Sequence, residues 1–588
     1  MIGRTPESLR DPSQADPAAA ASTSEAAVRT TGRWFGPAGR PLLGWLSCAP
    51  DRMSVSGVVV LPPVAYAYWC SHRTLRVLAE TLVERGHTVL RVDYDGTGDS
   101  AGDQWDPDRV RLWRDSARAA AGELRSLGCE RIVVVGAKLG GTFALLDGQS
   151  LGADRIVVWA PVLSGRRYVR ELRLLSKPVP EAEDPLDPPG TIVAQGSVLS
   201  AQTLADLGRL AITKLTAPPA PEILVVGDRA SGGDDGVEHL RSLGADVRHV
   251  QLEDGELALA TPPEEGDADR AVIAEISDFI GIAEPGSVPL PADRPEAELS
   301  WGKATIREQV LRLGEHGYVG LLSSPLEPDP TRATVLFLNT GSESHVGPGR
   351  AWVEFARSLA AEGYRTVRVD FRGWGESPDD GRAPGRLYDP RGEGDTVEIV
   401  GALEDAGHER VVLVGLCASA WIALRAVLQR SVAGVIALNP QMYWEQGDTL
   451  TIDWDKVRAG RAQEIRRLER GQRCGLWNLL DAVGYRPWAG AWLDDLKATA
   501  VPIHLVFAEG DDGLVFLRQR HPRRLARVKR AGTITVRELH GVDHPMHLAW
   551  RRPRVLAALV DILAGDRGRA DLKTTGVAPP EDDRGPGT

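Results

Sequence analysis

The residue best suited to covalent chemistry in this sequence is Cys417. It follows an apolar, β-branched run, Val411–Val414, and precedes a run of helix formers, so the pattern predicts a strand, a tight turn and a helix. The segment Gly415-Leu416-Cys417-Ala418-Ser419 follows the G-x-S-x-G pattern of a nucleophile elbow, with cysteine in place of serine. Such a turn points the thiol out of the sheet at a helix N-terminus, where the helix dipole favours a thiolate nucleophile.

The alternative interpretation of Cys417 is a buried cysteine that packs as a small hydrophobic residue. The other cysteines, Cys48, Cys70, Cys129 and Cys474, are scattered through the chain without metal-ligand spacing. An odd total without paired spacing favours reduced thiols and a cytoplasmic protein. We therefore expect no metal site and no cofactor.

A second elbow pattern surrounds Lys138, in the segment Gly136-Ala137-Lys138-Leu139-Gly140. Each elbow is preceded by an Asp-x-x-Gly-x-Gly-x-Ser turn, at Asp93–Ser100 and at Asp370–Ser377. The two turns lie 277 residues apart (93 to 370) and the two elbows 279 residues apart (138 to 417). Two motifs repeated at nearly one offset indicate a tandem duplication of a whole domain.

The elements that must position these turns alternate between apolar strands and amphipathic helices, which predicts α/β domains with mostly parallel sheets. A chain of 588 residues is too long for one core. We expect a disordered tail over residues 1–31, a first domain over 32–283, a Pro-rich linker over 284–300, a second domain over 301–565 and a disordered tail over 566–588.

Composition excludes several functional classes. The net charge of -12 argues against nucleic acid as a partner. No apolar run approaches the roughly 20 residues that span a bilayer. The first 30 residues contain no apolar segment of the kind found in secretory signals.

The repeated pair of turn and elbow resembles the α/β-hydrolase fold, present twice, over about residues 32–282 and 303–564. The turn type and the leading hairpin are similar to those of the serine-aminopeptidase-like and exosortase-associated branches of that superfamily. The resemblance implies two tandem α/β-hydrolase domains, each with helices on both faces of its sheet and a helical lid insertion. It says little about the substrate, because this fold supports many chemistries.

The resemblance also implies a triad in which nucleophile, acid and histidine follow one another along the chain. Asp511 matches the position of the acid, with Asp512 as the alternative. His544 matches the position of the histidine, with His540 and His547 as alternatives.

In such a triad the histidine shares the proton of the Cys417 thiol, and the acid fixes the tautomer of the histidine. The oxyanion would be held by backbone N–H groups of Ala418 and of a preceding loop, at Gly341 or Ser342. We interpret His345, in the same loop, as a residue near the mouth of the site.

Residues 441–500 are too many for a simple connection between strands, and the resemblance places a lid there. Its tryptophans either line an acyl pocket or pack the lid onto the sheet, and Cys474 is expected to be structural. These tryptophans are Trp444, Trp454, Trp477, Trp488 and Trp492.

The first domain lacks the catalytic set. Lys138 stands at the nucleophile position, and the segment Glu253-Asp254-Gly255-Glu256 stands where the histidine is expected. His249 falls inside a predicted strand. We interpret the first domain as a degenerate hydrolase that contacts the second domain, with binding of an acidic group by Lys138 as the alternative.

These residues favour an acyl-transfer enzyme that forms a thioester on Cys417 and then hydrolyses or transfers the acyl group. The combination of cysteine, aspartate and histidine is similar to that of the dienelactone-hydrolase branch. The acyl donor would be a small-molecule or carrier-bound ester or thioester. The alternatives are a binding or scaffold protein with two degenerate sites, and a peptidase.

Overall fold

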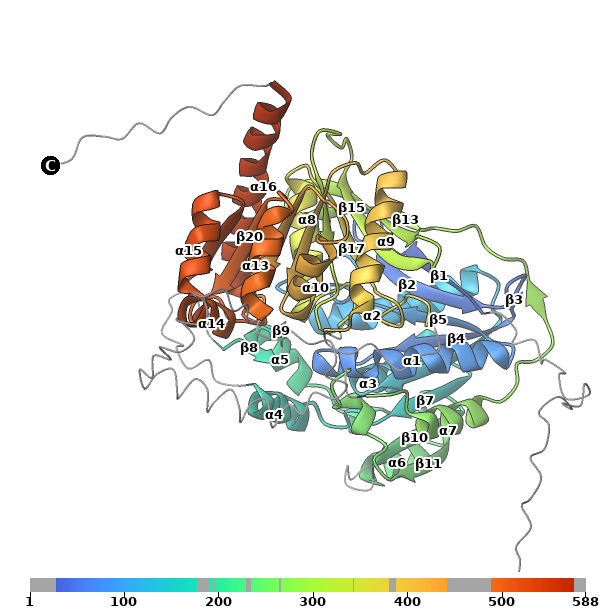
Figure 1. The fold of residues 1–588 in the computed structure, drawn as a ribbon. Coiled ribbons are helices and arrows are strands. Elements are labelled where there is room, and N and C mark those ends of the chain that lie inside the picture. Colours follow the sequence, from blue (N-terminus) through green and yellow to red (C-terminus); the bar gives the residue numbers. More distant parts are fainter. Residues whose placement is uncertain are drawn as a thin grey trace, which may run out of the picture.

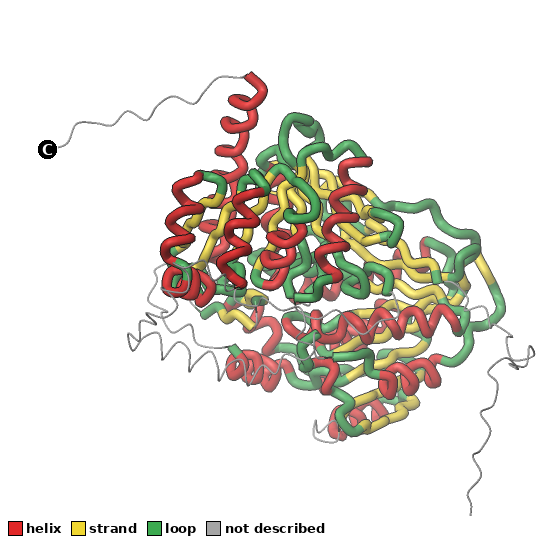
Figure 2. The backbone as a smooth tube through the Cα atoms, viewed as in Figure 1, coloured by secondary structure: helices red, strands yellow, loops and turns green. Residues whose placement is uncertain are grey.

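The structure is a computed structural model that describes residues 28–176, 190–194, 196–228, 234–263, 266–341, 343–379, 388–441 and 488–575. The chain forms two units, each built on one large sheet, with the first unit blue to green and the second yellow-green to red in Figure 1. Figure 2, in which strands are yellow and helices red, shows helices along both sheets.

The first sheet has the strand order β1-β2-β5-β4-β6-β7-β10-β11. Strands β1 and β2 form an antiparallel hairpin that joins β5, and the strands from β5 to β11 are parallel. Their bounds are β1 Arg29–Phe35, β2 Leu42–Cys48, β4 Ser56–Leu61, β5 Thr88–Val92, β6 Arg131–Ala137, β7 Arg155–Trp159, β10 Glu222–Asp228 and β11 Asp246–Leu252.

Helices cover both faces of the first sheet because its strands are apolar on both sides. Helices α2 (Arg109–Ser126) and α3 (Leu139–Leu151) pack on one face, and α1 (Tyr66–Glu84) and α7 (Arg270–Ile280) pack on the other. Helices α4 (Gly165–Leu175), α5 (Ala201–Gly208) and α6 (Asp234–Ser242) complete the α-helices described in this unit.

The second sheet has the order β13-β14-β15-β17-β16-β18-β19-β20-β21, which repeats the first order and adds β13 at the edge. Helices α8 and α16 pack on one face, and α9, α10 and α13 on the other. The strands are β13 Glu296–Trp301, β14 Ala304–Leu313, β15 Tyr318–Pro325, β16 Thr334–Phe337, β17 Arg365–Val369, β18 Val411–Leu416, β19 Gly434–Leu438, β20 Ile503–Ala508 and β21 Ile534–Leu539. The helices are α8 Ala351–Ala361, α9 Arg391–Asp405, α10 Ala418–Ala426, α13 Trp488–Ala498, α14 Asp512–Arg520, α15 Pro522–Ala531 and α16 Arg552–Thr575.

The expected linker over residues 284–300 is partly strand. Strand β12 (Ser287–Val288) pairs with β3 (Met53–Ser54) of the first unit, and β13 pairs with β14. In β13 the buried Leu299 stands between more exposed residues, and this alternation lets a short segment cover the edge of the sheet. The second unit therefore begins at Glu296 rather than at residue 301.

Both expected tail boundaries also shift. Strand β1 begins at Arg29, because residues 29–31 pair with residues 46–48 of β2. Helix α16 continues past residue 565 to Thr575, through a segment that contains the helix formers Ala570, Leu572 and Lys573. Of the expected lid, residues 442–487 lie outside the described part of the chain, including Cys474 and three of its tryptophans, Trp444, Trp454 and Trp477.

The antiparallel ends of the two sheets pack against each other. Trp34, Leu43 and Trp45 of the first unit form one buried cluster with Leu299, Ile306, Val319 and Leu321 of the second. Among the described helices, none combines the length and apolar character needed to cross a membrane.

Candidate active site

Cys417 occupies the sharp turn between β18 and α10, as the sequence pattern predicts. Its φ of 56° and ψ of -108° are strained for a residue with a side chain. A Cβ atom on Gly415 would lie 2.4 Å from the backbone carbonyl of Ser419, so only glycine fits before the turn. The Cys417 N–H donates to the Leu438 carbonyl of β19 at 3.0 Å, which ties the turn to the sheet.

Asp511 and His544 meet at the carboxyl ends of β20 and β21. His544 Nδ1 lies 2.5 Å from Asp511 Oδ2, and the other oxygen of Asp511 accepts a hydrogen bond from the Gly513 N–H at the start of α14. Asn439 braces both loops, since its Nδ2 donates to the His544 carbonyl at 2.8 Å and its Oδ1 accepts from the Ala508 N–H at 2.6 Å. Hydrogen bonds to the surrounding backbone therefore hold Asp511 and His544 in position.

The surroundings of Cys417 and His544 favour proton transfer from the thiol to the imidazole. Burial lowers the pKa of His544, but hydrogen bonds and charges from Asp511 and Cys417 outweigh it and raise that pKa to about 10. Burial raises the pKa of the Cys417 thiol, but His544, Tyr388 and the Ala418 N–H bring it below its ordinary value of 9.0. By contrast, burial, reinforced by the nearby Cys48, raises the pKa of Cys129 to about 12. The surroundings of Cys417 therefore favour its thiolate form, and those of His544 favour the imidazolium.

The alternative residues take other positions. Asp512 is the first residue of α14, and Asp511 is the residue that bonds to His544. His540 is exposed and pairs with Glu509 at 3.1 Å. The backbone N–H of His547 donates to Asp543 at 2.8 Å.

The loop between β16 and α8 brings Gly341 close to the elbow. Gly341, with a φ of 57°, lines the same small cavity of about 20 Å³ as Ala418. Ser342, the other predicted oxyanion residue, lies outside the described residues. The Ala418 N–H is hydrogen-bonded to the Cys417 thiol, and Gly341 borders the same cavity as Ala418.

Two polar side chains that the sequence analysis missed lie beside Cys417 and His544. The Tyr388 hydroxyl lies 3.4 Å from Cys417 Sγ and donates to Gln441 Oε1 at 3.2 Å. Gln441 Nε2 lies 3.4 Å from His544 Nε2. Neither residue belongs to a recognisable motif, and only the folded chain brings them to the thiol.

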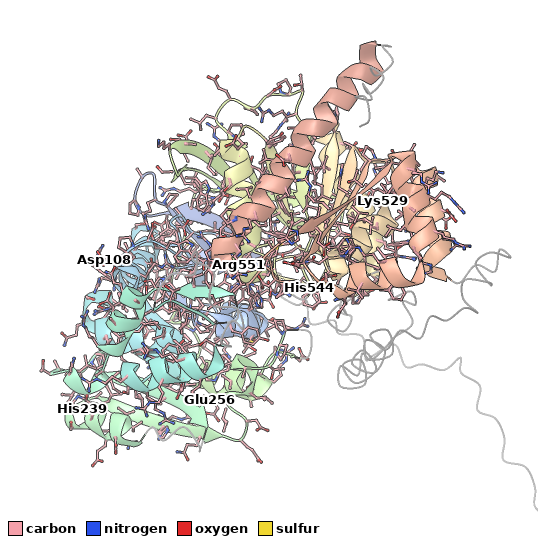
Figure 3. The ribbon with its side chains drawn as sticks, turned by 90° about the vertical axis from the view of Figure 1, so that its left-hand side faces the viewer. Asp108, His239, Glu256, Lys529, His544 and Arg551 are labelled. Atoms are coloured by element: carbon pink, nitrogen blue, oxygen red, sulfur yellow. The ribbon has the colours of Figure 1, made fainter. Side chains whose placement is uncertain are left out.

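The first elbow has the same backbone and different side chains. Lys138 has φ 49° and ψ -118°, and its Nζ lies 2.8 Å from Glu256 Oε2, in the segment where the histidine was expected. This ion pair lines a cavity of about 630 Å³ together with Ser164, Arg167 and Tyr168. Figure 3 labels Glu256 in the first unit and His544 in the second, well separated in the view, so the two elbows open onto different sites.

No set of three or more His, Cys, Asp and Glu side chains among the described residues is arranged to hold a metal ion. The described cysteines are all free thiols.

The chain has the α/β-hydrolase fold that the sequence predicted: the model of the alpha/beta hydrolase family matches residues 335–559, and two large, mostly parallel sheets carry the chain. None of the curated proteins matches the sequence.

Among solved structures, Est1E from Butyrivibrio proteoclasticus with bound ferulic acid is 17% identical, and the match covers 42% of this chain and 98% of that protein with a TM-score of 0.32. A predicted CIB-like hydrolase from Thermoplasma acidophilum is 14% identical over 44% and 98% of the two chains, with a TM-score of 0.28. A proline iminopeptidase from Mycobacterium smegmatis is 14% identical over 45% and 99%, with a TM-score of 0.30.

Proposed function

We propose that the protein is an acyl-transfer enzyme in which Cys417 forms a thioester with the acyl group of an ester or thioester. The observation that carries this proposal is the alignment of Cys417, His544 and Asp511, with a depressed thiol pKa and a raised histidine pKa at a strained elbow. A buried cysteine with a purely structural role has its pKa raised by burial, as Cys129 does.

The first half-reaction forms the acyl-enzyme. The Cys417 thiolate attacks the acyl carbon, and the new S–C bond converts the carbonyl oxygen into an oxyanion beside the N–H groups of Ala418 and Gly341. Collapse of this intermediate breaks the bond to the leaving alcohol or thiol, which takes the proton held on His544 Nε2. Asp511 holds the opposite ring nitrogen and keeps the imidazolium oriented.

The second half-reaction releases the acyl group. Water, an alcohol or an amine attacks the thioester and gives its proton to His544, and the Cys417 thiolate leaves. A thioester is readily attacked by amines as well as by water, so hydrolysis and transfer use the same residues. We propose that the first unit, with Lys138 paired to Glu256, contributes as a partner domain rather than as a second catalytic site.

The test is to trap and characterise the acyl-enzyme. The full-length protein is mixed with a p-nitrophenyl ester or an acyl thioester, quenched in acid and weighed as an intact protein. We expect one added acyl group that neutral hydroxylamine removes, as it does from a thioester. Cys417→Ala should show no adduct, and Cys417→Ser should give, at most, an adduct that resists neutral hydroxylamine. An adduct of unchanged yield on Cys417→Ala would refute the proposal.

A further inference from the structure

His345 lies between the two units and is bonded to a carboxylate at each ring nitrogen. Its Nε2 lies 2.7 Å from Asp99 Oδ2 of the first unit, and its Nδ1 lies 2.6 Å from Asp370 Oδ2 of the second. The three side chains are 3%, 1% and 0% exposed, respectively. Burial lowers the pKa of His345, but the two carboxylates outweigh it and raise that pKa well above its ordinary value. His345 is therefore an imidazolium that donates on both sides.

His345 also anchors the loop that contains Gly341. The His345 N–H donates to Asp370 Oδ1 at 2.6 Å, and Asn339, at the start of the loop, donates to the same oxygen at 3.1 Å. Asn339 further donates to the Glu343 carbonyl at 2.9 Å, which closes the loop into a compact turn. The backbone around Gly341 is thus held from both ends through Asp370.

Asp99 is itself held firmly in place. Its carboxylate pairs with Arg368 of the second unit, its N–H donates to Asp93 at 3.0 Å, and its carbonyl accepts from Arg357 at 2.5 Å. A side chain fixed by this many contacts can transmit its position to the ring of His345.

A second set of ion pairs, at the equivalent positions of the duplicated units, also joins the two units. Glu376 of the second unit pairs with Arg91 of the first at 2.6 Å and with His72 at 2.9 Å. Asp99 and Glu376 lie 277 residues apart, as do Arg91 and Arg368, so the duplication relates the Asp99–Arg368 pair to the Glu376–Arg91 pair. The described hydrogen bonds of the Glu376 side chain go to Arg91 and His72 and do not include the Gly341 loop.

We propose that Asp99 is a positioning residue for the oxyanion loop of the other unit, acting through His345. This inference rests on the proposed function of Cys417. It gives the first unit a role in the reaction of the second. The carboxylate of Asp99, in the first unit, orients His345, and His345 in turn positions the N–H groups around Gly341. The equivalent carboxylate, Glu376, pairs the two units but does not position the oxyanion loop.

Two reactions of Cys417 in the full-length protein separate positioning of the oxyanion loop from general damage. Acylation by p-nitrophenyl acetate passes through an oxyanion, whereas alkylation by iodoacetamide requires the thiolate and forms no oxyanion. We expect Asp99→Asn to slow acylation by about 10- to 100-fold, somewhat less than outright loss of an oxyanion donor. Its alkylation rate should match that of the wild type.

Glu376→Gln is the matched control, since it removes the duplication-related buried carboxylate that also pairs with an arginine and a histidine of the other unit. We expect its acylation rate to equal that of the wild type even if its melting temperature falls as far as that of Asp99→Asn. His345→Gln should slow acylation as Asp99→Asn does, and the double variant should be no slower than either single variant, because both act through one loop.

The outcomes are distinct. Equal acylation rates for Asp99→Asn and the wild type would overturn the inference and leave the proposed function intact. The same acylation loss in Glu376→Gln, or a parallel loss of alkylation in Asp99→Asn, would reduce Asp99 to a structural role. A wild-type protein that is alkylated but never acylated at Cys417 would overturn both proposals.

Discussion

The two elbows share one backbone conformation and carry different side chains. Cys417 and Lys138 have nearly the same strained dihedral angles, and each N–H donates to the neighbouring strand, at Leu438 and Trp159. The strained turn is therefore a property of the fold, which glycines two residues before each apex permit. Chemistry depends on the side chains that the surrounding loops bring to the turn.

Those loops differ most in how their charges are arranged. In the second unit, His544 is hydrogen-bonded to both Asp511 and Cys417. In the first unit, Lys138 is paired directly with Glu256, and the described residues place no histidine between them. The first elbow therefore presents an ion pair where the second presents a thiol hydrogen-bonded to a histidine.

The largest effect should come from removing the thiol. Cys417→Ala is expected to lower kcat roughly 10⁶-fold, as loss of a nucleophile does in related triads. The elbow accepts a small residue, so the melting temperature should change little. Steady-state turnover with a p-nitrophenyl ester measures the loss, and activity near the wild-type level would show that the nucleophile lies elsewhere.

Removing the acid should have the next largest effect. Asp511→Asn is expected to lower kcat roughly 10⁴-fold, because the histidine loses the group that fixes its tautomer. Asp512→Asn is the matched control at the adjacent position and should retain most of the activity. A larger loss in the Asp512 variant would exchange the roles of the two residues.

The pH dependence of alkylation should distinguish Cys417 from an ordinary buried thiol. Because His544 lowers the pKa of Cys417, the wild-type thiolate should form, and iodoacetamide should react, below pH 9.0. In His544→Gln burial still raises the pKa of Cys417 while the histidine no longer lowers it, so the midpoint should move to higher pH than in the wild type. Rates of iodoacetamide modification against pH test this, and a midpoint unmoved by the substitution would show that the two side chains are not coupled.

The smallest effect should come from the first elbow. Lys138→Ala is expected to change turnover by less than about twofold, and loss of its partly exposed pair with Glu256 should cost about 0.2–1 kcal/mol of stability. Chemical unfolding and turnover of the same preparation measure both quantities. A folded Lys138→Ala protein without activity would make the first site part of the chemistry.

The sequence predicted the parts of this fold that depend on local patterns. The elbows, the strands before them and the pairing of Asp511 with His544 follow from residues next to strand ends, where chain order determines position. The two short strands within segment 284–300 were not predicted, because the prolines and glycine of that segment obscured them.

Contacts through space could not be predicted in the same way. Asp99 and His345 are 246 residues apart, and Tyr388 and Cys417, which are in contact, are 29 residues apart. His345 was interpreted as a residue near the mouth of the site, whereas it is buried between two carboxylates. The sequence around His345 carries no signal of this burial, because the packing of the two units creates its environment. The sequence around Tyr388 likewise gives no sign of its contact with Cys417.

The most direct test of the central claim is to locate the acyl group in the full-length protein at the level of single residues. The protein is acylated by a p-nitrophenyl ester, quenched in acid, digested at low pH and analysed by peptide mass spectrometry. We predict that the acyl group is found on the peptide containing Cys417 and is absent from the peptide containing Lys138. An acyl group on Lys138, or on any residue other than Cys417 at higher yield, would contradict the assignment of chemistry to the second elbow alone.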